Sequence, residues 1–322
     1  MLRPVAYVTI TKSDGSQTVF NWINYIEISK SYEHLTGTAK VILPKRITDT
    51  GLELFSGALP IFERGDNVLI EGGYFPNRYT LFEGFVSKVS ARIPVEIDCE
   101  DYMYLFKQFK FTYPPPSSIT IQKFSKTGKL LKYPKVSSAN ITLKQLFDGI
   151  FHDGDTNDYL TPNGVDYKLA DSTMSLGQLR VTEATPADVF DKLRDNYGLF
   201  TYMRGKTIYC GFASDAVQTN EAEYVIERVG INMNDLDYQQ AKDVKIRVQA
   251  VGMLPNGTKV TVNAGDDDGE QRTYHFYNVS DQAMLQKMAT ERVNQYKYTG
   301  FRGTFKTFGE PQLQHGDRCR LT

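Results

Sequence analysis

The residues that most often do chemistry in proteins, histidine and cysteine, are few in this sequence and lie far apart. The histidines occur singly, outside any HExxH or other paired motif, at His34, His152, His275 and His315. The cysteines are Cys99, Cys210 and Cys319. Three cysteines about a hundred residues apart offer neither a disulfide framework nor a CxxC metal knuckle. We therefore interpret the histidines as solvated or hydrogen-bonded structural residues and the cysteines as small apolar residues.

Two acidic clusters come closest to a metal site. Residues 153–158 supply oxygen ligands at alternate positions, but an EF-hand loop needs glycine at its sixth position and glutamate at its twelfth, where this chain has Asp158 and Gly164. Residues 266–269 could hold a cation loosely, although a solvated loop between two strands needs no cation. The adjacent carboxylates of Glu100 and Asp101 would point to opposite faces of a strand, so they are poorly placed to share a substrate.

Motifs for nucleotide binding and for hydrolysis are also missing. The sequence contains no GxxxxGKS/T loop, no GxGxxG after a strand and no GxSxG elbow. Aromatic and basic residues interleave over 106–111 and could stack on bases or sugars, but at the junction of two domains we expect them to pack the seam. The prediction is a protein that is not an enzyme, with no catalytic, cofactor-binding or metal-binding residues and no cofactor.

The bulk composition is that of a folded protein. Of the 322 residues, 37 are Lys or Arg and 38 are Asp or Glu, which gives a formal charge of -1, and 41% are hydrophobic. A chain this close to neutral lacks the basic excess that binding to a phosphate backbone requires, so we expect no specific nucleic-acid recognition. No stretch approaches the ~20 apolar residues of a membrane span, and the start of the chain has no long apolar signal region. We expect a soluble intracellular chain without membrane insertion.

A strand periodicity of two dominates the first hundred residues. The predicted strands are 5–10, 17–22, 24–31, 37–43 and 92–100. The first two flank Asp14-Gly15, a strong hairpin signal because both turn positions tolerate positive φ. This part of the chain is predicted to be an antiparallel sheet or a closed barrel.

Helical signals appear in the middle of the chain. The predicted elements are a short helix after Tyr102, helices that begin after Thr142 and Thr185, and hairpin strands at 199–203 and 206–211. Between the first two helices, residues 114–116 are all proline and forbid regular structure. Thr142 and Gln145 form a capping box, and Thr185-Pro186 places an N-cap before a helix that ends at Gly198. The middle segment is therefore predicted to be α+β.

The last part of the chain contains an internal echo of the first. Its predicted elements are strands at 244–250, 258–263 and 272–279 and a helix at 281–298. Beyond them, Gly316-Asp317 leads into a strand with apolar residues at the same offsets as after Gly65-Asp66. Two related barrels would explain the echo, and chance is the alternative because Gly-Asp before a strand is common.

The predicted fold is mainly β with an α+β middle segment. It consists of two tandem antiparallel β-barrel domains, the second incomplete at the C-terminus, plus a small α+β domain. We place the first barrel at 1–108, the middle domain at 109–222 and the second barrel at 223–322. A hairpin and helix inserted at about 256–298 are expected to pack on the middle domain.

In their order along the chain, several short segments resemble one known family. They are residues 26–31 with 35–39, 65–68 with 82–89, 99–103, 185–190 with 197–198, and 298–309 with Pro311 and 315–317. The family is the baseplate hub of contractile phage tails, the late-control-D type, whose fold is shared by the hub part of type VI secretion spike proteins. Family members usually continue beyond the second Gly-Asp strand, and this sequence does not.

The resemblance implies a structural role as baseplate hub or tail-tube initiator. It implies a homotrimer whose two barrels per subunit form a six-barrel ring that joins the tube to the spike, with a channel through which DNA can pass. The implied partners are the tail tube protein, the spike protein and other baseplate proteins. The implied location is the host cytoplasm during assembly and then the baseplate of a virion tail or injection system. Alternatives from other classes are a carbohydrate-binding or envelope-attachment module, suggested by the aromatic-rich β regions, and a cell-wall hydrolase domain.

Overall fold

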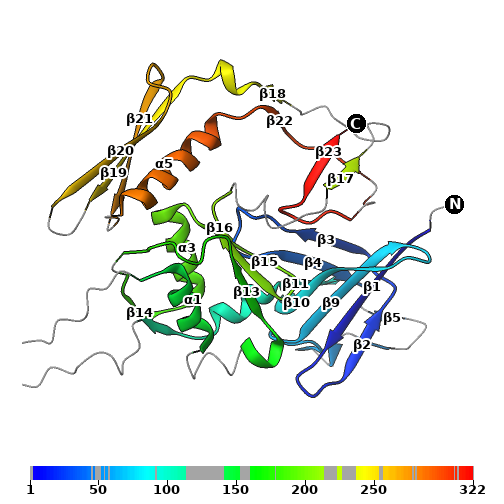
Figure 1. Cartoon of the computed structure of the whole chain (residues 1–322). Coiled ribbons are helices and arrows are strands. Elements are labelled where there is room, and N and C mark those ends of the chain that lie inside the picture. The colour runs from blue at the N-terminus through cyan, green and yellow to red at the C-terminus, as the bar shows by residue number, and fades with distance from the viewer. Residues whose placement is uncertain are drawn as a thin grey trace, which may run out of the picture.

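The chain is described by a computed structural model that is mainly β, with a large antiparallel sheet and a few helices (Figure 1). The described residues are 3–44, 46–47, 52–53, 55–56, 59–90, 93–113, 141–152, 160–177, 179–213, 223–226, 237–253, 257–277, 279, 281–307, 309 and 312–321. The predicted fold class is confirmed in its mainly β character and its α+β middle. The triple proline at 114–116 and the acidic cluster at 153–158 lie outside the described residues.

Seven strands form the first sheet, and every neighbouring pair is antiparallel, in the order β2-β1-β9-β10-β11-β4-β3. The strands are β1 (Pro4–Thr11), β2 (Gln17–Phe20), β3 (Tyr25–Ser29), β4 (Thr38–Leu43), β9 (Asn67–Tyr74), β10 (Tyr79–Val89) and β11 (Val95–Glu100). Two short strand pairs lie in the connection between β4 and β9, namely β5 (Arg46–Ile47) with β6 (Leu52–Glu53) and β7 (Phe55–Ser56) with β8 (Leu59–Pro60). The hairpin predicted at Asp14-Gly15 is present, with Gly15 at φ +83°.

The first sheet is rolled but not closed. Its edges, β2 and β3, are joined by only four residues, 21–24, which can span at most ~18 Å from Phe20 to Tyr25. The edges of a flat sheet of seven strands would lie ~29 Å apart, so the sheet must curl to bring them together. One cluster of buried side chains from β1, β2, β4, β9, β10 and β11 fills the inside. The predicted closed barrel is therefore corrected: among the described residues, no ladder joins β2 to β3.

The middle segment combines two helices with small sheets. It contains η1 (Tyr102–Lys107), β12 (Phe111–Tyr113), α1 (Leu143–His152), η3 (Thr161–Asn163), β13 (Asp166–Leu169), β14 (Val181–Ala184), α3 (Pro186–Tyr197), β15 (Phe200–Arg204) and β16 (Thr207–Gly211). The predicted capping box is present, since Thr142 and Gln145 exchange hydrogen bonds. The predicted N-cap Thr185 also forms a capping box, with Asp188 as its partner. Gly198 ends α3 at φ +71°, which glycine adopts without strain.

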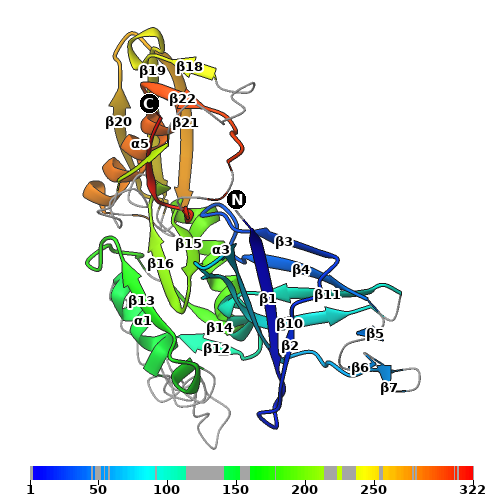
Figure 2. The ribbon, with the colours of Figure 1, turned by 90° about the vertical axis from the view of Figure 1, so that its right-hand side faces the viewer.

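A three-stranded sheet covered by a helix follows. Its elements are η4 (Ala241–Asp243), β19 (Ile246–Met253), β20 (Lys259–Gly265), β21 (Glu270–Tyr277) and α5 (Gln282–Tyr296). Buried residues of α5, such as Leu285 and Ala289, join the same apolar cluster as Val248 of β19 and Phe190 of α3. Figure 2 shows this unit at one end of the molecule, with α3, β15 and β16 between it and the first sheet. The domain boundaries at 108/109 and 222/223 stay a prediction.

The predicted second barrel is represented by two separate strand pairs among the described residues. β17 (Glu223–Ile226) pairs in parallel with β23 (Arg318–Leu321), and β18 (Asp237–Gln239) pairs antiparallel with β22 (Gly300–Arg302). The unit of β19, β20, β21 and α5 is inserted in the chain between β18 and β22. This part of the chain therefore carries strands in the predicted order but shows no closed sheet within its described residues.

Candidate interaction surfaces

Among the described side chains, the histidines and cysteines do not gather into a site. Cys99 and Cys210 are buried, and burial raises the pKa of each thiol to about 12, whereas Cys319 is exposed. His34 lines a cavity and His275 is exposed on β21, far apart in the sequence and in the fold. Among the described residues, no three His, Cys, Asp or Glu side chains are placed to hold a metal ion.

The acidic loop at 266–269 is a crossover connection between two strands. It carries the chain from β20 over the start of β19 to β21, and an added Cβ at Gly269 would lie 2.6 Å from the Ile246 backbone. Lys297 Nζ donates to both carboxylate oxygens of Asp266 at 2.6 Å, and Lys245 pairs with Asp268. The hydrogen bond from Lys297 holds the pKa of Asp266 below its usual value. These carboxylates are therefore paired with lysines of the protein.

The neighbours Glu100 and Asp101 have separate roles, because Glu100 ends β11 whereas Asp101 lies beyond the strand as the N-cap of η1, so their separation does not come from the predicted alternation of strand faces. Glu100 pairs with Lys107 at 2.7 Å. Asp101 is buried, caps η1 through the Met103 amide at 3.0 Å and accepts the Gly37 amide at 2.7 Å. Burial raises the pKa of Asp101 to about 7. Asp101 thus ties the β3–β4 connection to η1.

The aromatic and basic run at 106–111 packs the seam, as predicted. Phe106, Phe109 and Phe111 are buried, and the Phe106 ring lies 5.6 Å from that of Phe190 and 5.8 Å from that of Phe151. These rings are therefore not accessible for stacking on bases or sugars.

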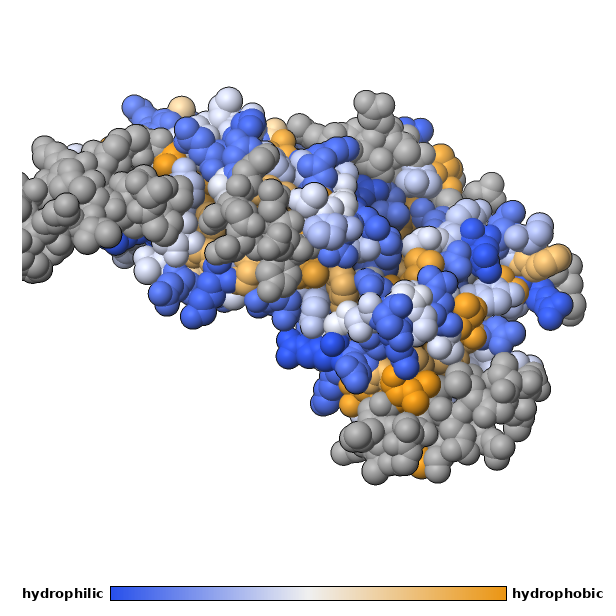
Figure 3. All heavy atoms as spheres, turned by 90° about the horizontal axis from the view of Figure 1, so that it is seen from below, coloured by the Kyte–Doolittle hydropathy of each residue, from blue (hydrophilic) through white to orange (hydrophobic). Residues whose placement is uncertain are grey.

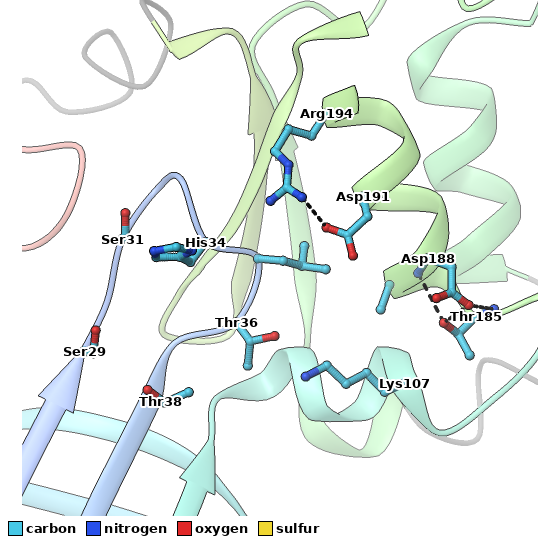
Figure 4. Close-up of a pocket in the computed structure, with 12 residues that line it drawn as sticks. Ser29, Ser31, His34, Thr36, Thr38, Lys107, Thr185, Asp188, Asp191 and Arg194 are labelled. Carbon is cyan, nitrogen blue, oxygen red and sulfur yellow. Dashed lines mark hydrogen bonds and ion pairs between the residues drawn. The ribbon is translucent and has the colours of Figure 1, made fainter. Parts of the chain in front are cut away.

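A cavity of about 650 Å³ lies between the β3–β4 connection and α3 (Figure 4). Its lining residues are Ser29, Ser31, His34, Leu35, Thr36, Thr38, Lys107, Thr185, Ala187, Asp188, Asp191 and Arg194. Its charges are already paired, because Arg194 contacts Asp191 at 3.1 Å and Lys107 contacts Glu100. The lining contains no Phe, Tyr or Trp ring on which a sugar could stack, so this cavity gives the carbohydrate-binding alternative no support.

Exposed large hydrophobic side chains concentrate on the first sheet and its connections. They are Val19, Trp22, Tyr25, Phe75, Tyr79 and Ile93, whereas Val225 and Tyr277 lie elsewhere. The face seen from below is mostly hydrophilic, with small separate hydrophobic areas (Figure 3). We call three of these residues the edge patch: Val19 on β2, Tyr25 on β3 and Trp22 in the connection between the two strands. They lie beside strand edges that no described strand covers. Open strand edges with aromatic residues are suited to contacts with other chains.

The two Gly-Asp turns that the sequence singled out share one geometry. Gly65 and Gly316 have φ of +98° and +86°. In the first turn, the Glu63 amide donates to Asp66 Oδ2 at 2.9 Å, and in the second the Gln314 amide donates to Asp317 Oδ2 at 2.8 Å. Each Asp amide donates back to the carbonyl three residues earlier. The predicted echo is therefore confirmed for the two Gly-Asp turns themselves.

The contacts that the second turn makes with the rest of the chain could not be predicted from the sequence. Residues 312–317, called here the C-terminal turn, lie on β15, where Arg204 donates to Asp317 Oδ1 at 2.8 Å and to Gln314 Oε1 at 3.2 Å. The Asp317 and Arg204 side chains are 2% and 16% exposed. The His315 ring packs edge-on against Tyr202 with 5.0 Å between centroids. Arg204 is the last residue of β15, beside an ordinary hairpin turn, so only the fold reveals its partner.

Comparisons with known proteins give the fold a context. No protein-family model and no curated protein matches this sequence. Its structure is similar to that of the tail protein from Neisseria meningitidis MC58, with a TM-score of 0.56 and 12% identity over 98% of this chain and 86% of that one. It is also similar to the prophage tail protein gp18 from Listeria monocytogenes EGD-e, with a TM-score of 0.50 and 11% identity over 87% of this chain and 76% of that one. The chain therefore has the fold of phage tail proteins. No helix within the described residues is long and apolar enough to cross a membrane.

Proposed function

We propose that this chain is a structural component of a phage tail or phage-like contractile injection system, acting at the baseplate as hub or tube initiator. The observation that carries the proposal is the similarity to a solved tail protein over 98% of the chain. The described residues contain no metal-binding cluster, and the two acidic candidates among them, the 266–269 loop and Asp101, are paired with lysines or backbone amides. A protein of this kind acts through its surfaces.

The finer proposal is a homotrimer in which each chain contributes two related β modules to a ring of quasi-sixfold symmetry. The matching Gly-Asp turns support two related modules, since the same hydrogen bond forms within each turn and a strand follows each turn directly. The open edges of the first sheet support contacts with neighbouring chains, because closed symmetric rings need such exposed and complementary surfaces. The partners would be the tail tube protein, the spike protein and other baseplate proteins. The chain would assemble in the host cytoplasm and end in the tail baseplate.

The test is the mass and shape of the full chain in solution. Mass photometry and negative-stain images over a range of concentrations are expected to show a trimeric ring with six similar lobes. A chain that stays monomeric at every concentration, alone and with its tube partner, would overturn the hub proposal.

The edge patch supplies a sharper version of the same test. Trp22 and Tyr25 are 60% and 49% exposed, so a double change of Trp22→Ser and Tyr25→Ser should leave the folded chain intact. We expect it to weaken trimer formation by roughly 100-fold or more, because buried aromatic anchors dominate the free energy of protein interfaces. Tyr277→Ser is the matched control, since Tyr277 is 63% exposed and lies on β21, away from the first sheet. An unchanged trimer in the double variant would place the contacts on other surfaces.

A further inference from the structure

His315 occupies an unusual position for a titratable side chain. Both imidazole nitrogens are shielded from solvent and lack a well-formed hydrogen bond. The ring packs against Tyr202 in a T-shaped arrangement. His315 also lines a cavity of about 440 Å³ whose other walls include Ile28, Lys30 and Leu81 of the first sheet. The imidazole is therefore held between the first sheet and β15 with little polar support.

The charges around His315 oppose its protonation. Lys30, just after β3, and Arg204 on β15 both act against a positive ring, while the backbone of Met203 on β15 and Asp317 in the same turn act in its favour. Asp317 already pairs with Arg204, so it cannot fully offset another cation. From β10 the cavity receives Thr80 and Leu81, which carry no charge. A proton on His315 would thus be a third cation near one carboxylate, in a place from which water is largely excluded.

We propose that the C-terminal turn is an acid-sensitive latch, which docks on β15 while His315 is neutral and is released when His315 takes up a proton. The docked turn is held by the buried Arg204–Asp317 pair and by the contact between His315 and Tyr202. In the released turn the imidazole is hydrated and free to bind a proton. The latch couples one proton to the position of β23, which begins directly after Asp317.

The direction of the effect follows from the two protonation equilibria. Burial, with help from Lys30 and Arg204, lowers the pKa of His315 from 6.5 to about 4. Because the folded pKa lies below the free value, docking is complete above pH 6.5 and is progressively lost as the pH falls toward 4. Between pH 7.5 and pH 5 the docking equilibrium should fall by roughly 30-fold.

The test is hydrogen exchange of the full-length chain, read by mass spectrometry as protection factors for peptides covering 312–321. We expect protection there to fall by roughly 30-fold between pH 7.5 and pH 5, while peptides from β1 and β9 keep their protection. In His315→Gln, which cannot titrate, the protection of 312–321 should not change with pH. His275→Gln is the matched control and should behave as the parent chain, because His275 is exposed on β21.

A second variant and a direct titration keep the proposal falsifiable if His315→Gln does not fold. Lys30→Met keeps the alkyl stem but removes one opposing charge, so the loss of protection at pH 5 should become several-fold smaller. Proton and carbon NMR of the histidine rings in the parent chain should show one ring that stays neutral down to about pH 5. Unchanged protection of 312–321 in the parent chain, the same loss in His315→Gln, or four rings that all titrate near pH 6.5 would each overturn the latch.

Discussion

The two Gly-Asp turns show how the same local structure can serve different surroundings. After the first turn, β9 is flanked on both sides by antiparallel strands, β1 and β10. After the second, β23 has one described neighbour, β17, and that neighbour is parallel. The first carboxylate, Asp66, is buried and caps its own turn, whereas Asp317 also binds the Arg204 guanidinium from β15. A Gly-Asp sequence therefore fixes a turn, but the partners of the next strand come from elsewhere in the chain.

The largest difference between the two turns should appear when each carboxylate is removed. Asp317→Ala would leave the Arg204 guanidinium, 16% exposed, without its carboxylate, and we expect docking of the C-terminal turn to weaken by about 3 kcal/mol. Asp66→Ala removes the acceptor of a single backbone amide, that of Glu63, and should cost about 1 to 2 kcal/mol of global stability. Hydrogen exchange of 312–321 measures the first effect and urea denaturation the second.

A matched control separates loss of the ion pair from loss of the turn. Asp317→Asn keeps an acceptor for the Gln314 amide but loses the charge that Arg204 requires. It should therefore retain most of the effect of Asp317→Ala, whereas Asp66→Asn should recover much of the stability lost in Asp66→Ala. Equal effects at the two turns would show that the Arg204 pair adds nothing to the second one.

The pH responses of the two regions should have opposite signs. Burial raises the pKa of Asp101, which anchors the first sheet to η1, to about 7, above its ordinary value of 3.8. Between these two pKa values the folded chain binds more protons at Asp101 than the unfolded chain does. The contribution of Asp101 to the free energy of unfolding therefore falls as the pH rises. We expect the free energy of unfolding to drop by on the order of 2 kcal/mol from pH 5 to pH 8 through this group.

Asp101→Asn isolates that contribution, because the amide does not titrate. Urea denaturation of the parent chain and of this variant at pH 5 and pH 8 gives the difference attributable to Asp101. The same slope in both chains would show that Asp101 titrates normally. The C-terminal turn, by contrast, should dock better at pH 8 than at pH 5, which makes the two sites distinguishable in one pH series.

Local signals in the sequence predicted the helices and hairpins well. Thr185, Pro186 and Gly198 define both ends of α3, and Asp14-Gly15 defines the first hairpin, because caps and tight turns depend on residues that are adjacent in the chain. The strands predicted at 244–250, 258–263 and 272–279 are present, shifted by a few residues, as β19, β20 and β21. Their pairing was not expected: the 266–269 loop crosses over the start of β19, so that β21 pairs with β19 in parallel, and no local pattern encodes such a crossing.

Contacts between residues far apart in the chain could not be predicted either, because no local sequence pattern encodes them. Arg204 and Asp317 are 113 residues apart, and each lies in or beside a turn that looks ordinary on its own. The open seam between β2 and β3 is also a property of the whole sheet, because it depends on how seven strands curl. The burial of Phe106 was predictable, since a run of aromatic residues at the junction of two predicted domains is most stable when it is buried there.

The smallest effect should come from the glycines of the two turns, and it tests whether the turns are equivalent. Gly65→Ala and Gly316→Ala each force a side chain into the left-handed region, at φ of +98° and +86°, which should cost about 1 kcal/mol at both positions. At Gly65 an added Cβ would meet only the Tyr104 hydroxyl at 3.6 Å, an ordinary contact, so the backbone conformation sets the cost. Urea denaturation for Gly65→Ala and hydrogen exchange of 312–321 for Gly316→Ala give the two values. Values that agree within about 0.5 kcal/mol would mean that the turns are the same local device, whereas a Gly316→Ala cost several times larger would mean that docking on β15 strains the second turn.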